Sequence, residues 1–218
     1  MTDTPSRFPI PAGPHRVEEI IQKSRFITAL DHAPSPDSAQ ASLNRIRVEY
    51  PDATHHCWAY LAGPPGDTAS IGMSDDGEPY GTAGRPMLTT LLHSGVGEIV
   101  AVCVRYYGGT KLGTGGLSRA YSGGVKLALE GLPKVEKVDR LALRLEVDYE
   151  AVDPLRRLLE ELVAQVESEE YEDKVRYGVA VPRERVEELT RRLIGITRGK
   201  AGIEVEEEKA EGEAPGNS

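Results

Sequence analysis

The sequence contains few cysteines and no long apolar run. Its 218 residues include two cysteines, Cys57 and Cys103, which are too few for a disulfide framework or a four-ligand zinc site. No apolar run approaches the roughly 18 residues that a membrane-spanning helix needs, and residues 1–14 lack the apolar segment of a signal peptide. We therefore expect a cytoplasmic protein with no membrane partner, and we interpret both cysteines as packing residues of buried strands.

Two common phosphate-binding motifs are missing from the glycine-rich residues 106–121 (YYGGTKLGTGGLSRAY). This stretch has no Gly-Lys-Ser/Thr ending, so it is not a Walker A loop. Ser118 stands where a GxGxxG pattern beginning at Gly113 requires its last glycine. No serine or threonine here has a base at a diagnostic spacing, so the sequence predicts no catalytic triad.

A predicted strand leads into this glycine-rich stretch. Residues 99–104 are apolar and mostly β-branched, which predicts a strand buried on both faces. Apolar residues recur at helical spacing from Leu117 onward. Backbone N–H groups at a helix start attract anions, and Arg105, Lys111 and Arg119 add positive charge. The pattern therefore predicts a phosphate site; the alternative is that the glycines serve only tight turns.

A second small-residue segment, residues 74–86 (SDDGEPYGTAGRP), precedes an apolar-periodic helix that starts near Met87. Its acidic residues are Asp75, Asp76 and Glu78. We interpret them as part of a turn, because the ligand ladder of an EF-hand is missing. They are the only candidates for a divalent metal, and the sequence predicts no metal site.

The segment HHCWAYLA at residues 55–62 predicts a strand. Side chains alternate across a strand, so His55 and Cys57 share a face while His56 points to the other. A packed strand is therefore favoured over a metal site. His55 lies at the strand end, where its ring is able to face a ligand.

The remaining patterns predict two domains of the α+β class, residues 15–134 and 139–206. Four prolines predict an extended arm at residues 1–14, and residues 207–218 read as an acidic, disordered tail.

In the first domain we predict strands at 15–21 and 25–31 joined by a turn at Lys23 and Ser24, a helix at 36–50 and a strand at 55–62. In the second we predict a strand at 141–149, a helix through Leu155 and Leu162, a hairpin of 165–171 and 174–181, a helix starting at Pro182 and a strand at 202–206. This βαββαβ order is typical of a ferredoxin-like domain.

Negative charge is concentrated in the second half of the chain. Residues 1–138 carry 13 Lys/Arg and 14 Asp/Glu, a net charge of −1, whereas residues 139–218 carry 13 and 21, a net charge of −8. The first half is therefore able to present a basic surface although the whole chain is acidic.

Three motifs in this order resemble the IMPACT family in its bacterial, YigZ-type form: HHCWAYLAG, SDDGEPYGTAGRPML and VRYYGGTKLGTGGLSRAY. The resemblance implies an N-terminal α/β domain like domain 2 of ribosomal protein S5 and domain IV of elongation factor G. It implies a ferredoxin-like second domain similar to domain V of that factor. It also implies a role near the ribosome or RNA, with Arg85, Arg105, Lys111 and Arg119 as matching cationic positions.

Our leading hypothesis is a non-enzymatic RNA- or ribosome-binding protein that acts in translation or stress regulation without a cofactor. Its predicted phosphate- and nucleic-acid-binding residues are Arg85, Arg105, Tyr107, Lys111, Gly113, Thr114, Gly115, Gly116, Arg119 and His55. The first alternative is a magnesium-dependent enzyme, or a binder of a phosphorylated small molecule or nucleotide, in which the acidic turn holds the metal. The second is a protein-interaction role in translation, with the acidic second domain facing a basic partner.

Overall fold

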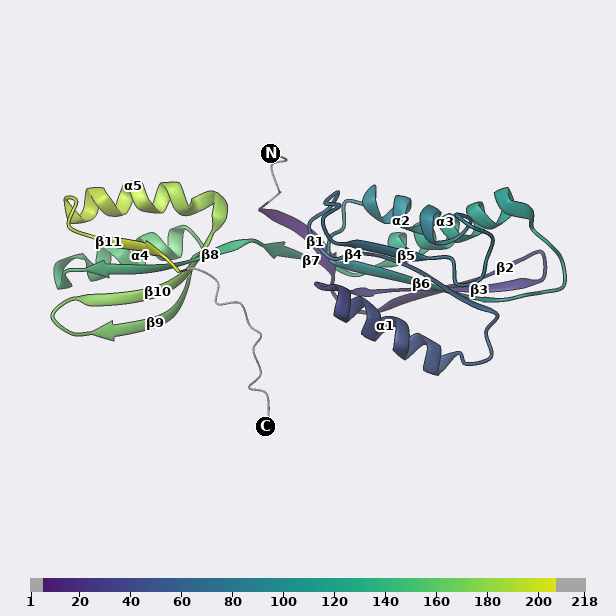
Figure 1. The fold of residues 1–218 in the computed structure, drawn as a ribbon. Helices are drawn as coiled ribbons and strands as arrows, with labels where there is room; N and C mark the ends of the chain where they lie inside the picture. The colour runs from purple at the N-terminus through teal and green to yellow at the C-terminus, as the bar shows by residue number, and fades with distance from the viewer. Residues whose placement is uncertain (1–5, 207–218) are drawn as a thin grey trace, which may run out of the picture. The chain divides into compact units, whose positions relative to one another are not determined.

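A five-stranded antiparallel sheet organises the first of two units in the computed structural model, which describes residues 6–206 (Figure 1). The chain divides into these units, Met1–Lys137 and Val138–Ser218. The strand order of the first sheet is β2 (His15–Ile21), β3 (Ser24–His32), β6 (Ile99–Tyr106), β4 (His55–Leu61) and β5 (Ile71–Ser74). The predicted acidic tail and residues 1–5 of the predicted arm lie outside the described residues.

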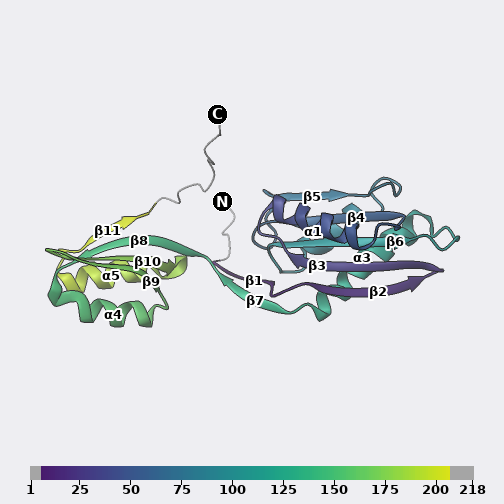
Figure 2. The same ribbon diagram turned by 90° about the horizontal axis from the view of Figure 1, so that it is seen from below.

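Helices cover both faces of this sheet. The helix α1 (Pro36–Glu49) lies on one face, and α2 (Gly84–Leu92) and α3 (Gly113–Gly131) lie on the other (Figures 1 and 2). A hydrophobic core lies on each face of the sheet, and successive side chains of the central strand β6 point alternately into one and the other. Cys103 packs on the α2–α3 side, and Val102 packs on the α1 side. The prediction of a strand buried on both faces is therefore confirmed.

The two cysteines lie opposite each other on β4 and β6. Both are buried, and burial raises the pKa of each thiol. They are therefore neutral thiols that pack in the core, as the sequence predicts.

Three strands of the first unit were not expected from the sequence. The strand β1 (Arg7–Pro11) pairs with β7 (Lys134–Val138) in a separate two-stranded sheet, and β5 extends the main sheet at its edge. The predicted turn at Lys23 and Ser24 is shifted by one residue, because the left-handed positions are Gln22 and Lys23. Ser24 is instead the first, buried residue of β3.

The second unit has its own four-stranded antiparallel sheet with the order β11, β8, β10, β9. Along the chain its elements are β8 (Arg140–Val147), α4 (Val152–Glu161), β9 (Gln165–Tyr171), β10 (Val175–Pro182), α5 (Val186–Thr197) and β11 (Gly202–Val205). Leu155 of α4 and Leu189 of α5 share one buried core with Leu145 and Tyr177 of the sheet. Pro182 ends β10, opposite Arg140, so α5 begins later than predicted.

The predicted α+β class is confirmed by these two mixed units. Between residues 6 and 206, no helix combines the length and the apolar character that crossing a membrane demands.

Candidate functional site

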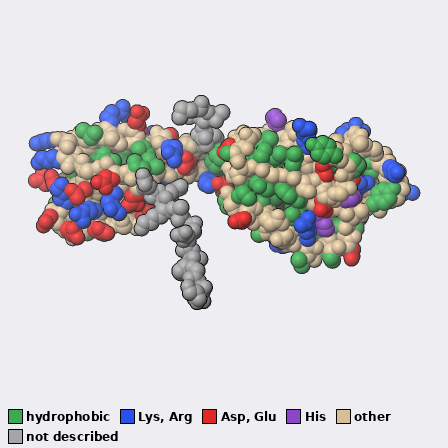
Figure 3. All heavy atoms as spheres, in the orientation of Figure 1, with side chains coloured by type: hydrophobic (Ala, Val, Ile, Leu, Met, Phe, Trp, Pro, Cys, Tyr) green, Lys and Arg blue, Asp and Glu red, His purple; other side chains and the backbone are tan. Residues whose placement is uncertain are grey.

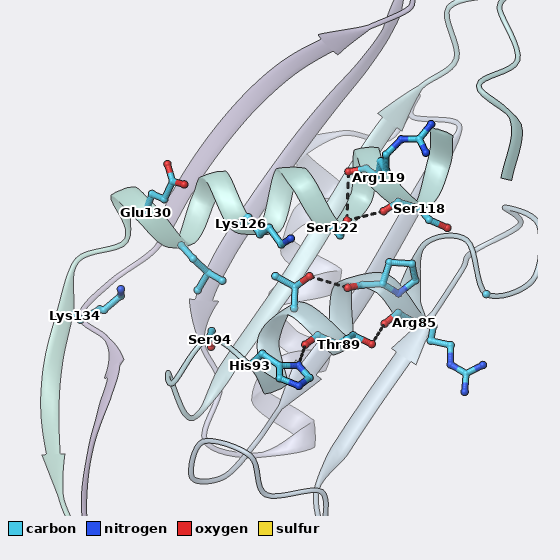
Figure 4. Close-up of a pocket in the computed structure, with 14 residues that line it drawn as sticks. Arg85, Thr89, His93, Ser94, Ser118, Arg119, Ser122, Lys126, Glu130 and Lys134 are labelled. Carbon is cyan, nitrogen blue, oxygen red and sulfur yellow. Dashed lines mark hydrogen bonds between the residues drawn. The ribbon is translucent and has the colours of Figure 1, made fainter. Parts of the chain in front are cut away.

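A groove of about 920 Å³ runs between α2 and α3 on the surface of the first unit (Figure 4). Arg85 of α2 and Arg119 of α3 line one end, and His93 and Glu130 line the other. The two helices therefore run in the same direction, with both N-termini at the arginine end. The positive end of the α3 helix dipole adds to the charge of that end, because α3 has no acidic residue in its first turn.

Positively charged side chains dominate the groove. Arg85, Arg119, Lys126 and Lys134 line it and are exposed, against one carboxylate, that of Glu130. Among the described residues, none of these four cations has an ion-pair or side-chain hydrogen-bond partner. The groove therefore carries uncompensated positive charge.

Two further cations extend this surface beyond the N-terminal end of α3. Lys111 lies in the loop between β6 and α3, and Lys23 lies in the turn between β2 and β3. This turn and loop touch, because a Cβ built on Gly108 would lie 2.0 Å from the carbonyl carbon of Lys23. Figure 3 shows Lys and Arg side chains at this end of the unit. We call the whole set the cationic face: Lys23, Arg85, Lys111, Arg119, Lys126 and Lys134.

The other positively charged residues of the first unit are paired with carboxylates. They are Arg7, Arg16, Arg25, Arg45, Arg47, Arg105 and Lys137. The 13 Lys/Arg of this unit thus divide into seven that are paired and six that form the cationic face. A surface with six cations that lack an ion-pair partner within residues 6–206 attracts a ligand with several negative charges.

The structure corrects the prediction that Arg105 contacts phosphate. Its side chain is 5% exposed and donates from Nη1 to Oε1 of Glu78 at 2.6 Å. Its Nη2 donates to Ser24 Oγ at 3.2 Å, and its guanidinium carbon lies 5.3 Å from the ring centre of Phe26. Glu78 lies in the loop between β5 and α2, which also carries Asp75 and Asp76 and which we call the acidic loop. Arg105 is therefore a buried structural residue that fixes the acidic loop onto the sheet.

The three acidic residues that were the candidates for a divalent metal all accept hydrogen bonds from other groups of the protein. Asp75 accepts the backbone N–H groups of Gly81, Ala83 and Gly84 at 2.7, 2.9 and 2.8 Å. Its charge therefore caps the N-terminus of α2, where the adjoining residue offers no side-chain cap.

Asp76 and Glu78 bind other groups. Asp76 accepts the backbone N–H of His56 at 2.6 Å, and Glu78 binds Arg105 and the hydroxyl of Tyr121, the latter at 2.7 Å. Within residues 6–206, no three His, Cys, Asp or Glu side chains are grouped so that they are able to hold a metal ion. The acidic loop is a structural connection between β5 and α2.

His55 belongs to the same loop network. Its Nδ1 lies 2.8 Å from the carbonyl oxygen of Asp76, and its Nε2 lies 4.0 Å from a carboxylate oxygen of Glu78. Tyr107 is 47% exposed, and its ring centre lies 5.5 Å from the guanidinium carbon of Arg105. Neither residue lines the groove.

The glycines of the predicted phosphate loop form the first turn of α3, which begins at Gly113. They are Gly113, Gly115 and Gly116, with Thr114 between them. This places the backbone N–H groups at the arginine end of the groove rather than in a separate loop. Of the predicted cations, Arg85, Lys111 and Arg119 lie on the cationic face.

Sequence reasoning missed Lys126 and Lys134, which line the groove, and Tyr80, which is 96% exposed next to the groove residue Gly81. A signal for Lys126 was present, because it follows Arg119 by two helical turns and so shares its face.

Comparison with known proteins gives matches along nearly the whole chain. Residues 22–129 match the Impact N-terminal domain, and residues 145–200 match a domain of unknown function, DUF1949. The chain is 46% identical over 190 residues to IMPACT family member YigZ of Escherichia coli (strain K12), covering 87% of this chain and 93% of that protein. It is 40% identical over 200 residues to an IMPACT family member of Haemophilus influenzae, covering 92% and 97%.

One solved structure agrees with this relationship. A crystal structure described as that of a hypothetical protein is 44% identical, with a TM-score of 0.69, and the match covers 94% of this chain and 100% of that one. With these matches and its three motifs, the chain belongs to the IMPACT family.

Proposed function

We propose that this IMPACT family member is a non-enzymatic RNA-binding protein that associates with the ribosome or with another RNA of the cell. The cationic face carries the proposal, because its six side chains have no ion-pair partner among the described residues and the groove holds one carboxylate, that of Glu130. RNA supplies that counter-charge through its phosphates, and phosphate contacts account for most of the affinity of such complexes. Binding is confined to the first unit, since the second half of the chain is strongly acidic.

The arrangement of the cations favours a polymer over a single phosphate. Arg119 and Lys126 are seven residues apart on α3, which separates them by about 10.5 Å along the helix. Arg85 lines the groove from the other helix, α2, and Lys134 lines its far end. A line of separated positive charges fits a chain of phosphates. The exposed ring of Tyr80, which precedes the groove residue Gly81 in the sequence, provides a surface for base stacking.

The folds implied by the resemblance support the same proposal. We assign the first unit as like domain 2 of ribosomal protein S5 and the second as ferredoxin-like. The second assignment draws support from the βαββαβ order and the strand order β11, β8, β10, β9. A role in translation or in a stress response, in the cytoplasm, follows from these assignments as part of the proposal.

The test is RNA binding by the whole protein and by a variant of the cationic face. We expect the double variant Arg119→Gln, Lys126→Gln to bind a labelled RNA about tenfold or more weakly at low salt, because two phosphate contacts are lost. Arg157→Gln is the control: Arg157 is an exposed arginine on α4 of the second unit, without an ion-pair partner among the described residues.

The result that overturns the proposal is no RNA binding at low salt, or equal weakening by the control. Thermal unfolding with a panel of nucleotides and Mg²⁺ tests the enzymatic alternative. Stabilisation by one nucleotide, without RNA binding, would replace the proposal with a magnesium-dependent nucleotide protein.

A further inference from the structure

Hydroxyl side chains stand between the cations of the groove. They are Thr89 and Thr90 of α2, Ser94 just after α2, and Ser118 and Ser122 of α3. A phosphodiester has no proton and offers only acceptor oxygens, so phosphate binding explains a hydroxyl only where that hydroxyl is free to donate. Their hydrogen-bonding state therefore indicates what else the ligand carries.

Four of these hydroxyls already donate their proton to the protein backbone. Thr89 donates to the carbonyl oxygen of Arg85 at 3.0 Å, and Thr90 to that of Pro86 at 2.9 Å. Ser94 and Ser122 donate to backbone carbonyls at 2.7 and 2.8 Å. Figure 4 shows such bonds as dashed lines. A hydroxyl has one proton and two lone pairs, so toward the groove that they line these oxygens are left as acceptors only, and Ser94 already accepts the backbone N–H of Val96 at 3.1 Å.

His93 adds a further acceptor. Its Nδ1 lies 2.7 Å from the carbonyl oxygen of Thr89, and a carbonyl oxygen only accepts, so Nδ1 carries the ring proton. In the neutral ring Nε2 is then left as an acceptor. The groove thus combines cations, which bind phosphate, with fixed acceptors, which need a donor on the ligand.

On α2 an acceptor follows the single cation, and on α3 an acceptor lies between two cations. On α2, Arg85 is followed by Thr89, about 6 Å further along the axis. On α3, Arg119 is followed by Ser122 after about 4.5 Å and then by Lys126. Phosphate and sugar alternate along a nucleic-acid strand in the same way. The donor that RNA carries on each sugar is the 2′-hydroxyl, which DNA lacks.

We infer that the groove between α2 and α3 recognises the 2′-hydroxyls of an RNA strand and so selects RNA over DNA. The inference rests on the proposed RNA-binding function and adds the chemical group by which the groove distinguishes RNA from DNA. Thr89 and Ser122 are the acceptors that flank the arginines most closely in sequence, and we assign them as specificity-determining residues.

The experiment compares three labelled oligonucleotides of about 12 nucleotides, within the usual span of a single-strand site: oligouridine RNA, its deoxyuridine counterpart and its 2′-fluoro counterpart. The fluoro form lacks the donor. We expect RNA to bind about 3- to 10-fold more tightly than either analogue for each 2′-hydroxyl bond lost.

Variants separate the acceptors from the cations. Thr89→Val and Ser122→Ala should each weaken RNA binding about 3- to 10-fold and leave deoxyuridine binding unchanged. Arg119→Gln should weaken both ligands equally. Thr68→Val, an exposed threonine outside the groove, is the matched control. Thermal unfolding of each variant identifies one that has lost its fold.

Equal affinity for all three oligonucleotides, still sensitive to Arg119→Gln, overturns the 2′-hydroxyl inference and leaves the RNA-binding proposal standing. The inference also fails if Thr89→Val and Ser122→Ala weaken RNA and deoxyuridine binding alike. Absence of binding to any oligonucleotide and to ribosomes at low salt overturns the proposed function itself, and the inference with it.

Discussion

The buried pair of Glu78 and Arg105 gives the sharpest prediction about stability. Their side chains are 3% and 5% exposed and are joined at 2.6 Å. Burial raises the pKa of Tyr121, so its hydroxyl stays protonated and donates to the same carboxylate oxygen at 2.7 Å. Glu78→Ala removes the carboxylate and leaves the guanidinium buried without a counter-charge.

The expected cost is about 3–5 kcal/mol, the usual range when one partner of a buried ion pair is removed. A domain of this size loses about 4 °C of Tm per kcal/mol, so the Tm of the first unit should fall by about 12–20 °C. Glu130→Ala is the matched control, because Glu130 is an exposed glutamate without an ion-pair partner among the described residues. It should change the unfolding free energy by less than about 0.5 kcal/mol.

Tryptophan fluorescence is the suitable assay. Trp58 is the single tryptophan of the chain and lies in β4, so its emission reports the unfolding of the first unit alone. If Glu78→Ala costs less than about 1 kcal/mol, the ion pair does not hold the loop as described, and our argument for excluding Arg105 from the binding surface is refuted.

Three further predictions concern the same unit. Asp75→Ala should destabilise it by about 2–4 kcal/mol, measured by urea unfolding, since three backbone N–H groups lose a charged acceptor; a loss below about 0.5 kcal/mol would contradict the capping role. Gly84→Ala should cost about 1–3 kcal/mol, because the new Cβ would lie 2.9 Å from backbone atoms of the last residue of β5; an unchanged Tm would contradict this close contact. Burial raises the pKa of Glu98, but hydrogen bonds from Lys137 and His32 outweigh it, and the pKa lies below its ordinary value. The ionised Glu98 carboxylate therefore stabilises the fold above about pH 4.3, and this stabilisation is lost as the pH falls through the lowered pKa. The difference in Tm between the wild type and Glu98→Gln should narrow in acid. A difference that does not change with pH would contradict the role of the ionised carboxylate.

Sequence patterns predicted the elements whose buried residues follow a regular spacing within the element itself. The apolar run of β6 and the helical periodicity of α1 and α4 are visible without knowledge of their partners. The strands β1, β5 and β7 escaped prediction for different reasons. Prolines occupy β1, β5 has only four residues, and β7 is mostly charged or exposed. Each forms because a distant segment presents a free strand edge, which no local pattern records.

The candidate site was predictable only in part. Arg105 and Arg119 flank the same glycine-rich stretch, yet the first is buried and the second lies on the cationic face. The difference comes from the sheet: Arg105 lies between His55 of β4 and Phe26 of β3. Pairing of charges is likewise a tertiary property, so the sequence could not distinguish the six residues of the cationic face from the seven cations that are paired with carboxylates.

The most direct test of the central claim is the salt dependence of RNA binding. Each phosphate contact to a single strand contributes about −0.7 to the slope of log K against log salt. Six contacts by the cationic face therefore predict a slope of about −4, and the double variant Arg119→Gln, Lys126→Gln should reduce it to about −3. A slope near zero, or one that this variant leaves unchanged, would contradict the account.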